Sequence, residues 1–499
     1  MDRARKVNRK MESISEKLKE ICPEVADSVQ PAADVWWFGI RRKWWILSIV
    51  GAGTFMSALD TSIVNIALPT IGQSTHSSVS TIEWVILIYL ITLCSSLLIF
   101  GRLADIYGKR VIYMMGVTLF AVGSLFCGLS GRIGLLIASR AFQALGGAMI
   151  LSLGPAIVIS AFPSRERGRS LGIQATMTYL GFSAGPALGG LLTQRFGWPY
   201  IFFINVPIGL LIGFVSSKVL MREKRGAVQP FDPAGAGMLV VTLAPLLFAL
   251  SKGCEMGWRN PFVMGSFAVS AIAFVVFISI ERTVSHPALD LKLFSNRMFN
   301  ASVLAAYLCY LSSAAVNFLM PFYLLHSLGF GEAHSGLLLM ATPIAMMCLT
   351  APSGFISDKV GVRLPATLGM VVLSVGVFLL RGLGTDAGAH RIIPCLALIG
   401  IGSGLFTSPN NSAIMGSAPR DRQGVAGAML AAARTVGFAS GVALAGVIYV
   451  SRMSASAGIQ KNVAIANAMH AGVTVVACLV LVGAFMSAMR GKSVTQRRC

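Results

Sequence analysis

The chain has 499 residues, of which 55% are hydrophobic and only 12% are charged, and its formal net charge is +21. In soluble domains about a quarter of the residues are charged. This composition therefore excludes an ordinary soluble protein and indicates one that lies in a lipid bilayer. The excess charge does not call for a nucleic acid partner, because Lys and Arg gather in short segments between apolar runs, where they suit anionic lipid headgroups.

Apolar runs recur along the whole chain, each close to the length of about 20 residues with which a helix crosses a bilayer. They lack the alternation of a membrane barrel, so we expect helices. The sequence therefore predicts an all-α polytopic membrane protein with fourteen spans. The runs cover residues 44–69, 83–101, 111–130, 133–161, 171–193, 199–220, 233–251, 261–281, 300–325, 334–356, 365–383, 391–415, 424–450 and 468–489.

The placement of Lys and Arg predicts the orientation of these spans. Residues 1–43 form a polar extension that does not resemble a signal peptide. Most basic residues lie in this extension, in alternate loops and in the tail 490–499. The positive-inside rule then places both termini in the cytoplasm. The basic residues of the other side are Arg132, Arg195, Lys252, Arg259, Arg381, Arg391, Arg452 and Lys461.

The first apolar run contains Asp60, the one acidic residue of the chain that lies well inside such a run. A carboxylate inside the membrane is costly and normally faces a cavity or a cationic partner. We expect Asp60 to bind and release a proton. The alternative is a structural carboxylate that is permanently paired with a buried arginine.

A charged turn after the second run returns in degenerate form 253 residues later, in the second half of the chain. Its glycines suit a tight turn and a close approach of backbones, and its acid suits the positive end of a helix. We expect a conformational latch that closes the cytoplasmic side, whereas the plainer alternative is an ordinary basic turn. The latch residues are Gly101, Arg102, Asp105, Gly108, Lys109 and Arg110, with Asp358 and Arg363 in the copy.

The repeat divides the chain into two homologous six-helix bundles, at 44–220 and 300–489. A basic turn after the fourth run of each half, at 163–168 and 419–424, supports this division. Residues 221–299 then form a linker with two extra helices. Two repeated bundles with a substrate site between them are typical of secondary transporters.

Two arginines also lie inside apolar runs. Arg140 in the fourth run is the natural partner of Asp60, and Gln143 lies on a similar face one turn later. Holding helix carbonyls is the structural alternative for Arg140. Arg434 in the thirteenth run either lines a cavity or extends to the membrane edge.

The fifth run carries small residues at four-residue spacing, which allow two helices to pack backbone to backbone. A proline within this ladder favours a bend. We expect the pair of helices that the ladder packs together to lie at the moving interface between the bundles. It comprises Gly181, Gly185, Pro186, Gly189 and Gly190.

These motifs resemble those of the major facilitator superfamily, and specifically its fourteen-span drug:proton antiporter family (DHA2-type). The turn at 101–110 resembles the superfamily's loop signature, except for Ile106, where a basic residue is usual. Residues 59–69, which include Asn65, resemble the signature of the fourteen-span group. Residues 140–147 resemble a motif linked to proton transfer, and residues 181–190 resemble a signature of antiporters. The resemblance implies a bundle pair of that fold, coupling at Asp60 and Arg140, and Asn65, Gln143 and Arg434 as cavity candidates.

The sequence thus predicts a proton-coupled antiporter that exports lipophilic or cationic small molecules, by rocker-switch alternating access, as in multidrug efflux. One deep acid favours a monocation or a neutral lipophile, and the two arginines leave amphipathic anions possible. The alternatives are an exporter of a specific lipid or secondary metabolite, and a proton-coupled nutrient symporter of the same fold.

The remaining expectations concern cofactors, partners and location. We expect a monomer in the plasma membrane, of the bacterial inner-membrane type, driven by the proton gradient. No Walker-type loop suggests use of ATP, and no nucleophile–base pair suggests an enzyme. The nine cysteines show no C-x-x-C spacing, so neither a cofactor, a metal site nor a disulfide is predicted.

Overall fold

The computed structural model describes residues 36–37, 40–77, 79–220, 232–284, 291–419, 422–455 and 460–490. Nearly all of them are helical, and the one sheet among them is a two-stranded antiparallel pair, β1 (Trp36–Trp37) and β2 (Ile40–Arg41). The predicted all-α membrane fold is confirmed. Most of the predicted extension 1–43 and of the tail 490–499 lies outside the described residues.

The first half of the chain forms one bundle. Its core surrounds Tyr89, Tyr113 and Phe120, which are buried. The sixth crossing is interrupted at Ile204, between α8 and α9. The helices are α3 (Arg42–Thr75), α4 (Val79–Tyr107), α5 (Lys109–Leu129), α6 (Ile133–Ala161), the short η2 (Ser164–Glu166), α7 (Arg167–Phe196), α8 (Tyr200–Phe203) and α9 (Asn205–Val219).

The second half forms the other bundle, whose core surrounds Met320, Tyr323 and Phe406. Its helices are η3 (Leu291–Ser295), α12 (Arg297–Phe322), the π-helical turn η4 (Tyr323–Ser327), α13 (Glu332–Leu339), α14 (Ala341–Val360), α15 (Arg363–Leu379), η5 (Leu380–Gly382), α16 (Ala389–Ser417), α17 (Gln423–Ala455) and α18 (Lys461–Ala488).

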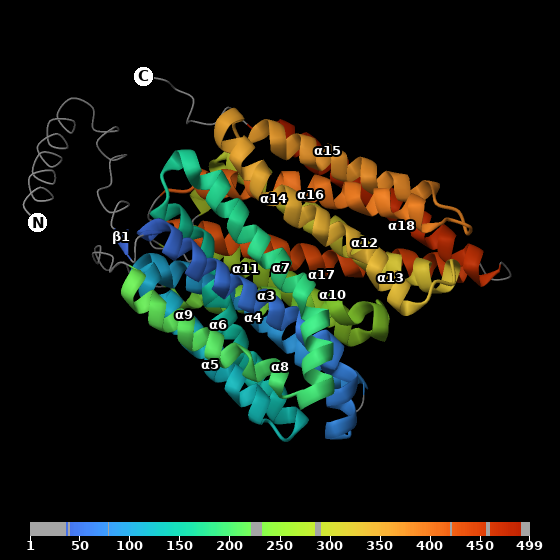
Figure 1. Ribbon diagram of the computed structural model, residues 1–499, viewed down its shortest axis with the longest axis horizontal. Coiled ribbons are helices and arrows are strands. Elements are labelled where there is room, and N and C mark those ends of the chain that lie inside the picture. Colours follow the sequence, from blue (N-terminus) through green and yellow to red (C-terminus); the bar gives the residue numbers. More distant parts are fainter. Residues whose placement is uncertain are drawn as a thin grey trace, which may run out of the picture.

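The two bundles lie side by side (Figure 1). We call the face of the molecule at which α3 begins and α18 ends the terminal face. There the bundles are in contact, chiefly through α4 with α17 and α7 with α14. Away from that face they diverge, toward α8 in one bundle and α13 in the other (Figure 1).

Between the bundles in sequence lie α10 (Pro233–Met256) and α11 (Pro261–Thr283). Each begins with proline at its first position, where the missing N–H costs nothing. The side chains of Asp232 and Asn260 accept hydrogen bonds from the first-turn N–H groups, which caps both helices.

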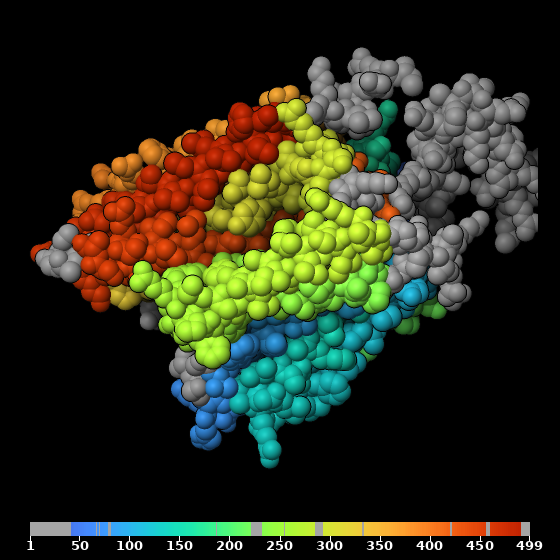
Figure 2. All heavy atoms as spheres, turned by 180° about the vertical axis from the view of Figure 1, so that it is seen from behind, coloured from blue at the N-terminus to red at the C-terminus, as the bar shows by residue number. Residues whose placement is uncertain are grey.

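This inserted pair covers one side of the seam between the bundles. In Figure 2 it lies between the N-terminal bundle and the end of the chain. α10 packs against α4 of one bundle and α17 of the other. Lys252 of α10 forms ion pairs with Glu83 of α4 and, at 2.5 Å, with Glu255. The inserted helices are therefore attached to the N-terminal bundle by an ion pair, while α10 contacts both bundles.

Thirteen segments of the described chain are helices that are long and apolar enough to cross a membrane. They match all the predicted runs except 171–193, which corresponds to α7. This helix has 30 residues, so it is long enough, but it is more polar. Because it packs against α3 and α14, only part of its surface needs to suit lipid. The count of fourteen thus depends on α7.

Candidate functional site

Asp60 lies on α3 inside the N-terminal bundle and is completely buried. Its Oδ2 accepts a hydrogen bond from Nη1 of Arg140 on α6 at 2.6 Å, which makes an ion pair between two side chains with almost no exposure. The two predicted coupling residues are therefore in contact. An ion pair without water is stable only if its remaining polar groups are also bonded.

Two amides satisfy the second carboxylate oxygen. Oδ1 of Asp60 accepts 2.9 Å hydrogen bonds from Nε2 of Gln143 and from Nδ2 of Asn205. Gln143 also donates to the Ser124 hydroxyl at 2.7 Å and accepts from Arg140 at 2.7 Å. Sequence reasoning missed Asn205 and Ser124. A lone asparagine in the run 199–220 was the available signal, whereas Ser124 resembled an ordinary small residue.

Arg140 is held from several sides as well. Its Nε donates to the carbonyl of Val85 on α4 at 3.3 Å. Its guanidinium lies over the ring of Tyr89 at 4.2 Å and near that of Phe202 at 5.6 Å. Cation–π contacts of a desolvated arginine are among the stronger ones. Together these bonds connect α3, α4, α5, α6 and the start of α9 through one carboxylate.

A change of protonation at this cluster would act on the whole bundle. If Asp60 takes up a proton, it loses the charge that Arg140 and the two amides are arranged to neutralise, so the packing of α3 on α6 and α9 must change. In a single static structure, a permanent structural ion pair would have the same geometry as a pair that couples to protons. The role of Asp60 and Arg140 as coupling residues stays a prediction.

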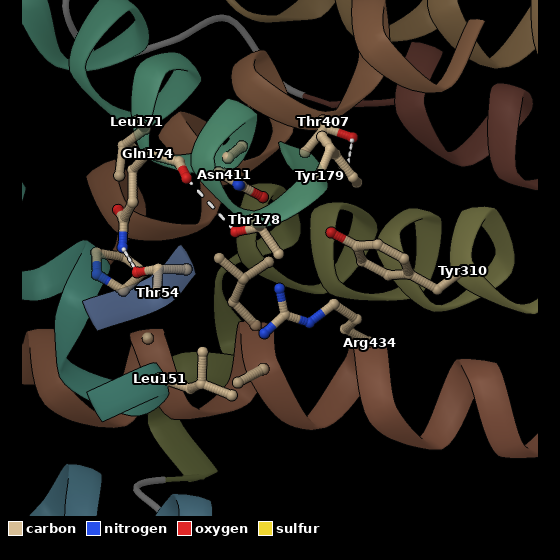
Figure 3. A pocket seen from close by; sticks show the side chains of 15 residues that line it. Thr54, Leu151, Leu171, Gln174, Thr178, Tyr179, Tyr310, Thr407, Asn411 and Arg434 are labelled. Carbon is tan, nitrogen blue, oxygen red and sulfur yellow. Dashed lines mark hydrogen bonds between the residues drawn. The ribbon is translucent and has the colours of Figure 1, made fainter. Parts of the chain in front are cut away.

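A cavity lies between the two bundles (Figure 3). It contains about 500 Å³ of empty space, part of which is open to solvent. Thr54 lies 12 residues after the start of α3, and Arg434 lies 11 residues after the start of α17. At about 1.5 Å per residue, both are about 17 Å from the terminal face. The lining residues are Thr54, Leu151, Pro155, Leu171, Gln174, Ala175, Thr178, Tyr179, Tyr310, Thr407, Asn411, Gly427, Leu430, Ala431 and Arg434.

The three predicted cavity residues are placed differently from one another. Arg434 lines the cavity. Gln143 does not, because it is buried against Asp60. Asn65 lies outside the cavity lining, on the outer part of α3, with an exposed side chain whose amide is 3.4 Å from the Thr61 carbonyl. Spacing along a helix could not separate the face that meets α6 from the face that meets the other bundle.

The predicted latch joins the two bundles at the terminal face. The carboxylate of Asp105, at the end of α4, accepts hydrogen bonds from the backbone N–H groups of Gly424 at 2.9 Å and Val425 at 3.2 Å. These groups belong to the first turn of α17, where the unpaired N–H groups and the helix dipole favour a negative charge. The helix whose positive end Asp105 faces therefore belongs to the other bundle.

The copy repeats this contact in the opposite direction. Asp358, at the end of α14, accepts hydrogen bonds from the N–H groups of Gly168 at 2.7 Å and Arg169 at 2.9 Å, in the first turn of α7. Each acid therefore binds the helix that follows the basic turn of the other half. The two repeated features that suggested duplication in the sequence are the two halves of one contact.

Glycines bring the backbones together at these contacts. A Cβ on Gly424 would lie 2.2 Å from the carbonyl oxygen of Gly101, and one on Gly354 would lie 2.2 Å from that of Gly168. Gly108 and Gly361, at equivalent places in the two turns, have φ of 97° and 87°, which favours glycine. The interface at the terminal face therefore requires glycine on both sides.

The basic residues of the latch make further contacts. Lys109 lies 3.2 Å from the Ser160 hydroxyl, and Arg110 donates to the carbonyl of Ser217 at 2.7 Å. Arg102 is buried, while Arg363 begins α15 with an exposed side chain. The acids accept hydrogen bonds from backbone N–H groups at helix starts, and the sequence did not indicate which helix each acid would meet.

The glycine ladder of α7 packs against α3. Cβ atoms on Gly181, Gly185 and Gly189 would meet Phe55, Ser62 and Ile63 of α3, at 2.6, 2.4 and 2.9 Å, whereas Gly190 has open space. Pro186 lies within the same helix. The ladder therefore packs α7 against a helix of its own bundle, and the expectation that this α3–α7 pair lies at the moving interface stays a prediction. It is the first part of α7, at Gly168 and Gly172, that meets the other bundle.

Comparison with known proteins agrees with this architecture. The model of the Major Facilitator Superfamily matches residues 50–442, with a second match at 302–497. The riboflavin transporter RibZ of Clostridioides difficile is 35% identical over 81% of this chain and 88% of its own length. The multidrug resistance protein Stp of Mycobacterium tuberculosis is 29% identical over 83% of this chain and 78% of its own length.

Among solved structures, the human organic anion transporter MFSD10 (TETRAN) superposes with a TM-score of 0.64 at 16% identity, covering 89% of this chain and 99% of the other. At this identity the likeness concerns the fold alone. It is consistent with the fold of two helical bundles.

Proposed function

Since the chain belongs to the Major Facilitator Superfamily and is therefore a membrane transporter rather than an enzyme, we propose that it exports small lipophilic molecules in exchange for protons. The observation that carries this proposal is the Asp60 cluster. A carboxylate that is buried in a membrane bundle, and bonded to side chains from other helices, converts the binding of a proton into a change of helix packing.

The substrate would enter the cavity between the bundles, and the latch would decide the side from which it is accessible. The distribution of Lys and Arg supports a cytoplasmic location of the terminal face. The structure then corresponds to a state that is closed toward the cytoplasm, held by the contacts of Asp105 with α17 and of Asp358 with α7. Opening that face means separating these contacts, as in a rocker-switch movement of two rigid bundles.

The proton would drive the exchange through the N-terminal bundle. A proton from outside neutralises Asp60 and weakens its bonds to Arg140, Gln143 and Asn205. Release of that proton to the cytoplasm restores the ion pair and the packing that accompanies it. Because the two states differ in packing within a bundle that carries half of the latch, proton binding shifts the balance between them.

A second candidate is the transport of one metabolite, by export or by symport. The relative at 35% identity is a riboflavin transporter, and the cavity lining is rich in hydroxyl and amide groups. Fixed polar groups of this kind favour a defined partner more than flexible apolar surfaces do. A narrow substrate range in the assay below would favour this function.

Proteoliposomes with a pH-sensitive dye inside test the exchange. We expect a panel of lipophilic cations, anions and neutral compounds to include members that move protons with the native protein, and Asp60→Asn to abolish that movement. Asp386→Asn, at an exposed acid between η5 and α16, is the matched control and should behave as the native protein. Compound-dependent proton flux that survives in Asp60→Asn would contradict the assignment of Asp60.

A further inference from the structure

The charge of the central cavity points to a particular class of substrate. Of the fifteen described residues that line it, Arg434 is the one with a charged side chain, and no acid is among them. A cavity with one net positive charge inside a bundle of low dielectric constant attracts anions and disfavours cations. This asymmetry is a property of the cavity that the composition of the chain does not reveal.

Arg434 is available to a ligand. Its side chain is partly exposed and extends into the same space as Thr178 and Tyr310 (Figure 3). Among the residues that the structure describes, no hydrogen bond or ion pair of Arg434 is found, and its electrostatic neighbours are the hydroxyl groups of Tyr179 and Tyr310. A guanidinium has five N–H donors in a planar fork that matches a carboxylate.

The rest of the lining is polar on some sides and apolar on others. Tyr179 and Thr407 are joined by a hydrogen bond of 3.1 Å across the two bundles, and Gln174 lies 3.4 Å from the Thr54 hydroxyl. Leu151, Leu171 and Leu430 supply apolar surface. The lining contains neither Met nor Phe, so the many such residues of the chain do not form a soft, adaptable wall here.

The one intramembrane acid cannot serve a cation in this cavity. Asp60 is fully buried, and all the bonds of its carboxylate go to Arg140, Gln143 and Asn205. It lies six residues beyond Thr54 on α3, which is about 9 Å farther from the terminal face. The site that would bind the proton and the cavity that would bind the substrate are therefore separate.

We infer that the cavity recognises planar aromatic weak acids, whose carboxylate or phenolate binds Arg434 while the ring lies among the leucines and tyrosines. This inference rests on the proposed function in taking the cavity as the transport site. It changes the substrate from the monocation or neutral lipophile that the sequence favoured to an amphipathic anion. It also implies that proton and substrate act on each other through helix packing and not by competition for one carboxylate.

Binding to the purified, detergent-solubilised protein tests the substrate class without any transport. The probes are anthracene-2-carboxylate, its methyl ester and the matching anthracenyl trimethylammonium ion, followed by their own fluorescence. We expect the carboxylate to bind most tightly and the cation least. Equal or tighter binding of the cation would overturn the inference, and so would absence of binding by the carboxylate.

Substitutions on α17 locate the site. Arg434→Gln should weaken the carboxylate about 10- to 100-fold, the usual effect of one charged hydrogen-bonding partner, and should leave the ester unchanged, which shows that the variant is folded. Arg434→Lys keeps the charge but loses the planar set of donors. Its affinity for the carboxylate should therefore lie between those of the native protein and of Arg434→Gln. Arg452→Gln, at an exposed arginine of the same helix, should change nothing. An equal loss for all three probes would contradict a role in charge recognition.

Transport of the same probes separates this inference from the proposed function. Exchange of one exported monoanion for one imported proton moves two positive charges inward, whereas exchange of a monocation for a proton moves none. A valinomycin-clamped potential, negative on the side that the anion leaves, should therefore accelerate transport of the carboxylate. Arg434-dependent binding without proton movement would contradict the exchange and leave the substrate class intact. Proton movement driven by the cation and not by the carboxylate would support the exchange and contradict the substrate class.

Discussion

Two buried arginines of this protein have opposite surroundings. Arg140 is paired with Asp60 and bonded further to Val85 and Gln143. Arg490, just after α18, is 1% exposed and points back into the second bundle, with Asn410 as its hydrogen-bond partner and Phe406 at 5.8 Å. Its Nε and Nη1 have no hydrogen-bond partner among the described residues. Burial lowers the pKa of Arg490 to about 9, so it still carries an unneutralised charge at neutral pH.

The same substitution should therefore have different effects at the two positions. Arg140→Met leaves Asp60 as a buried, unpaired carboxylate and should lower the free energy of unfolding by about 3–5 kcal/mol. Arg490→Met replaces a solitary buried charge by an apolar side chain of similar length and should leave stability unchanged or raise it. Thermal unfolding of both variants in the same detergent measures this difference. A similar loss in both would contradict the contrast drawn between paired and unpaired arginine.

At the residue scale, the sequence predicts the rare groups better than their partners. Asp60, Arg140 and Arg434 were identifiable because a charge inside an apolar run is unusual. Asn205 and Ser124 were not identifiable, and neither were the particular helix starts, at Gly424 and Gly168, that the latch acids bind. Small polar residues are common in membrane helices, and a backbone donor leaves no trace in the sequence. The partner of a side chain depends on which helix faces it.

At the scale of elements, the terminal face consists of two equivalent contacts, each made by the end of one helix and the beginning of another. The end of α4 meets the start of α17, and the end of α14 meets the start of α7. In both contacts a carboxylate binds free N–H groups while glycines allow the carbonyl of one helix to approach the other. A helix start is one of the few places where backbone donors remain available.

Alanine at these glycines should open the terminal face. A methyl group on Gly424 or Gly168 would lie 2.2 or 2.4 Å from a backbone oxygen of the other bundle, a distance that the closed state cannot accept. Strain of about 1.4 kcal/mol in the closed state lowers the ratio of closed to open molecules tenfold. The measurement is maleimide labelling of Ser408→Cys, which is buried beside Gly168, in a cysteine-free background. Labelling should increase in Gly424→Ala and in Gly168→Ala.

The matched control for this experiment is Gly416→Ala, because a Cβ at Gly416 on α16 meets nothing within 4 Å. Its labelling should equal that of the parent. Unchanged labelling in all three variants would mean that the glycine contacts do not hold the face closed.

At the scale of the whole molecule, the orientation of the chain depends on α7. With α7 as a membrane crossing, the fourteen crossings place both ends of the chain on one side. Without it, thirteen apolar segments would place them on opposite sides. Its polar composition follows from its position, since it is packed against α3 and α14 and contributes to the cavity through Gln174 and Tyr179.

Reporter proteins fused in the loops test whether α7 crosses the membrane. Alkaline phosphatase, active only outside the cytoplasm, should be active after Gly197, between α7 and α8, and also in the loop 257–260 between α10 and α11. Green fluorescent protein joined after Arg490 should fluoresce in the cytoplasm. An inactive phosphatase after Gly197 would show that α7 does not cross.

The sequence by itself determined the class of the protein, the helical segments, the duplication and the family, because hydrophobicity, charge bias and repeated turns are local properties that survive in one dimension. The charged residues inside the apolar runs belong to the same category. Only the tertiary structure decided that Gln143 joins Asp60 and not the cavity, that the glycines of α7 pack on α3, and that Arg434 is the single charge of the central cavity. These results depend on which helix face meets which neighbour, and that choice is made by the packing of all the helices together.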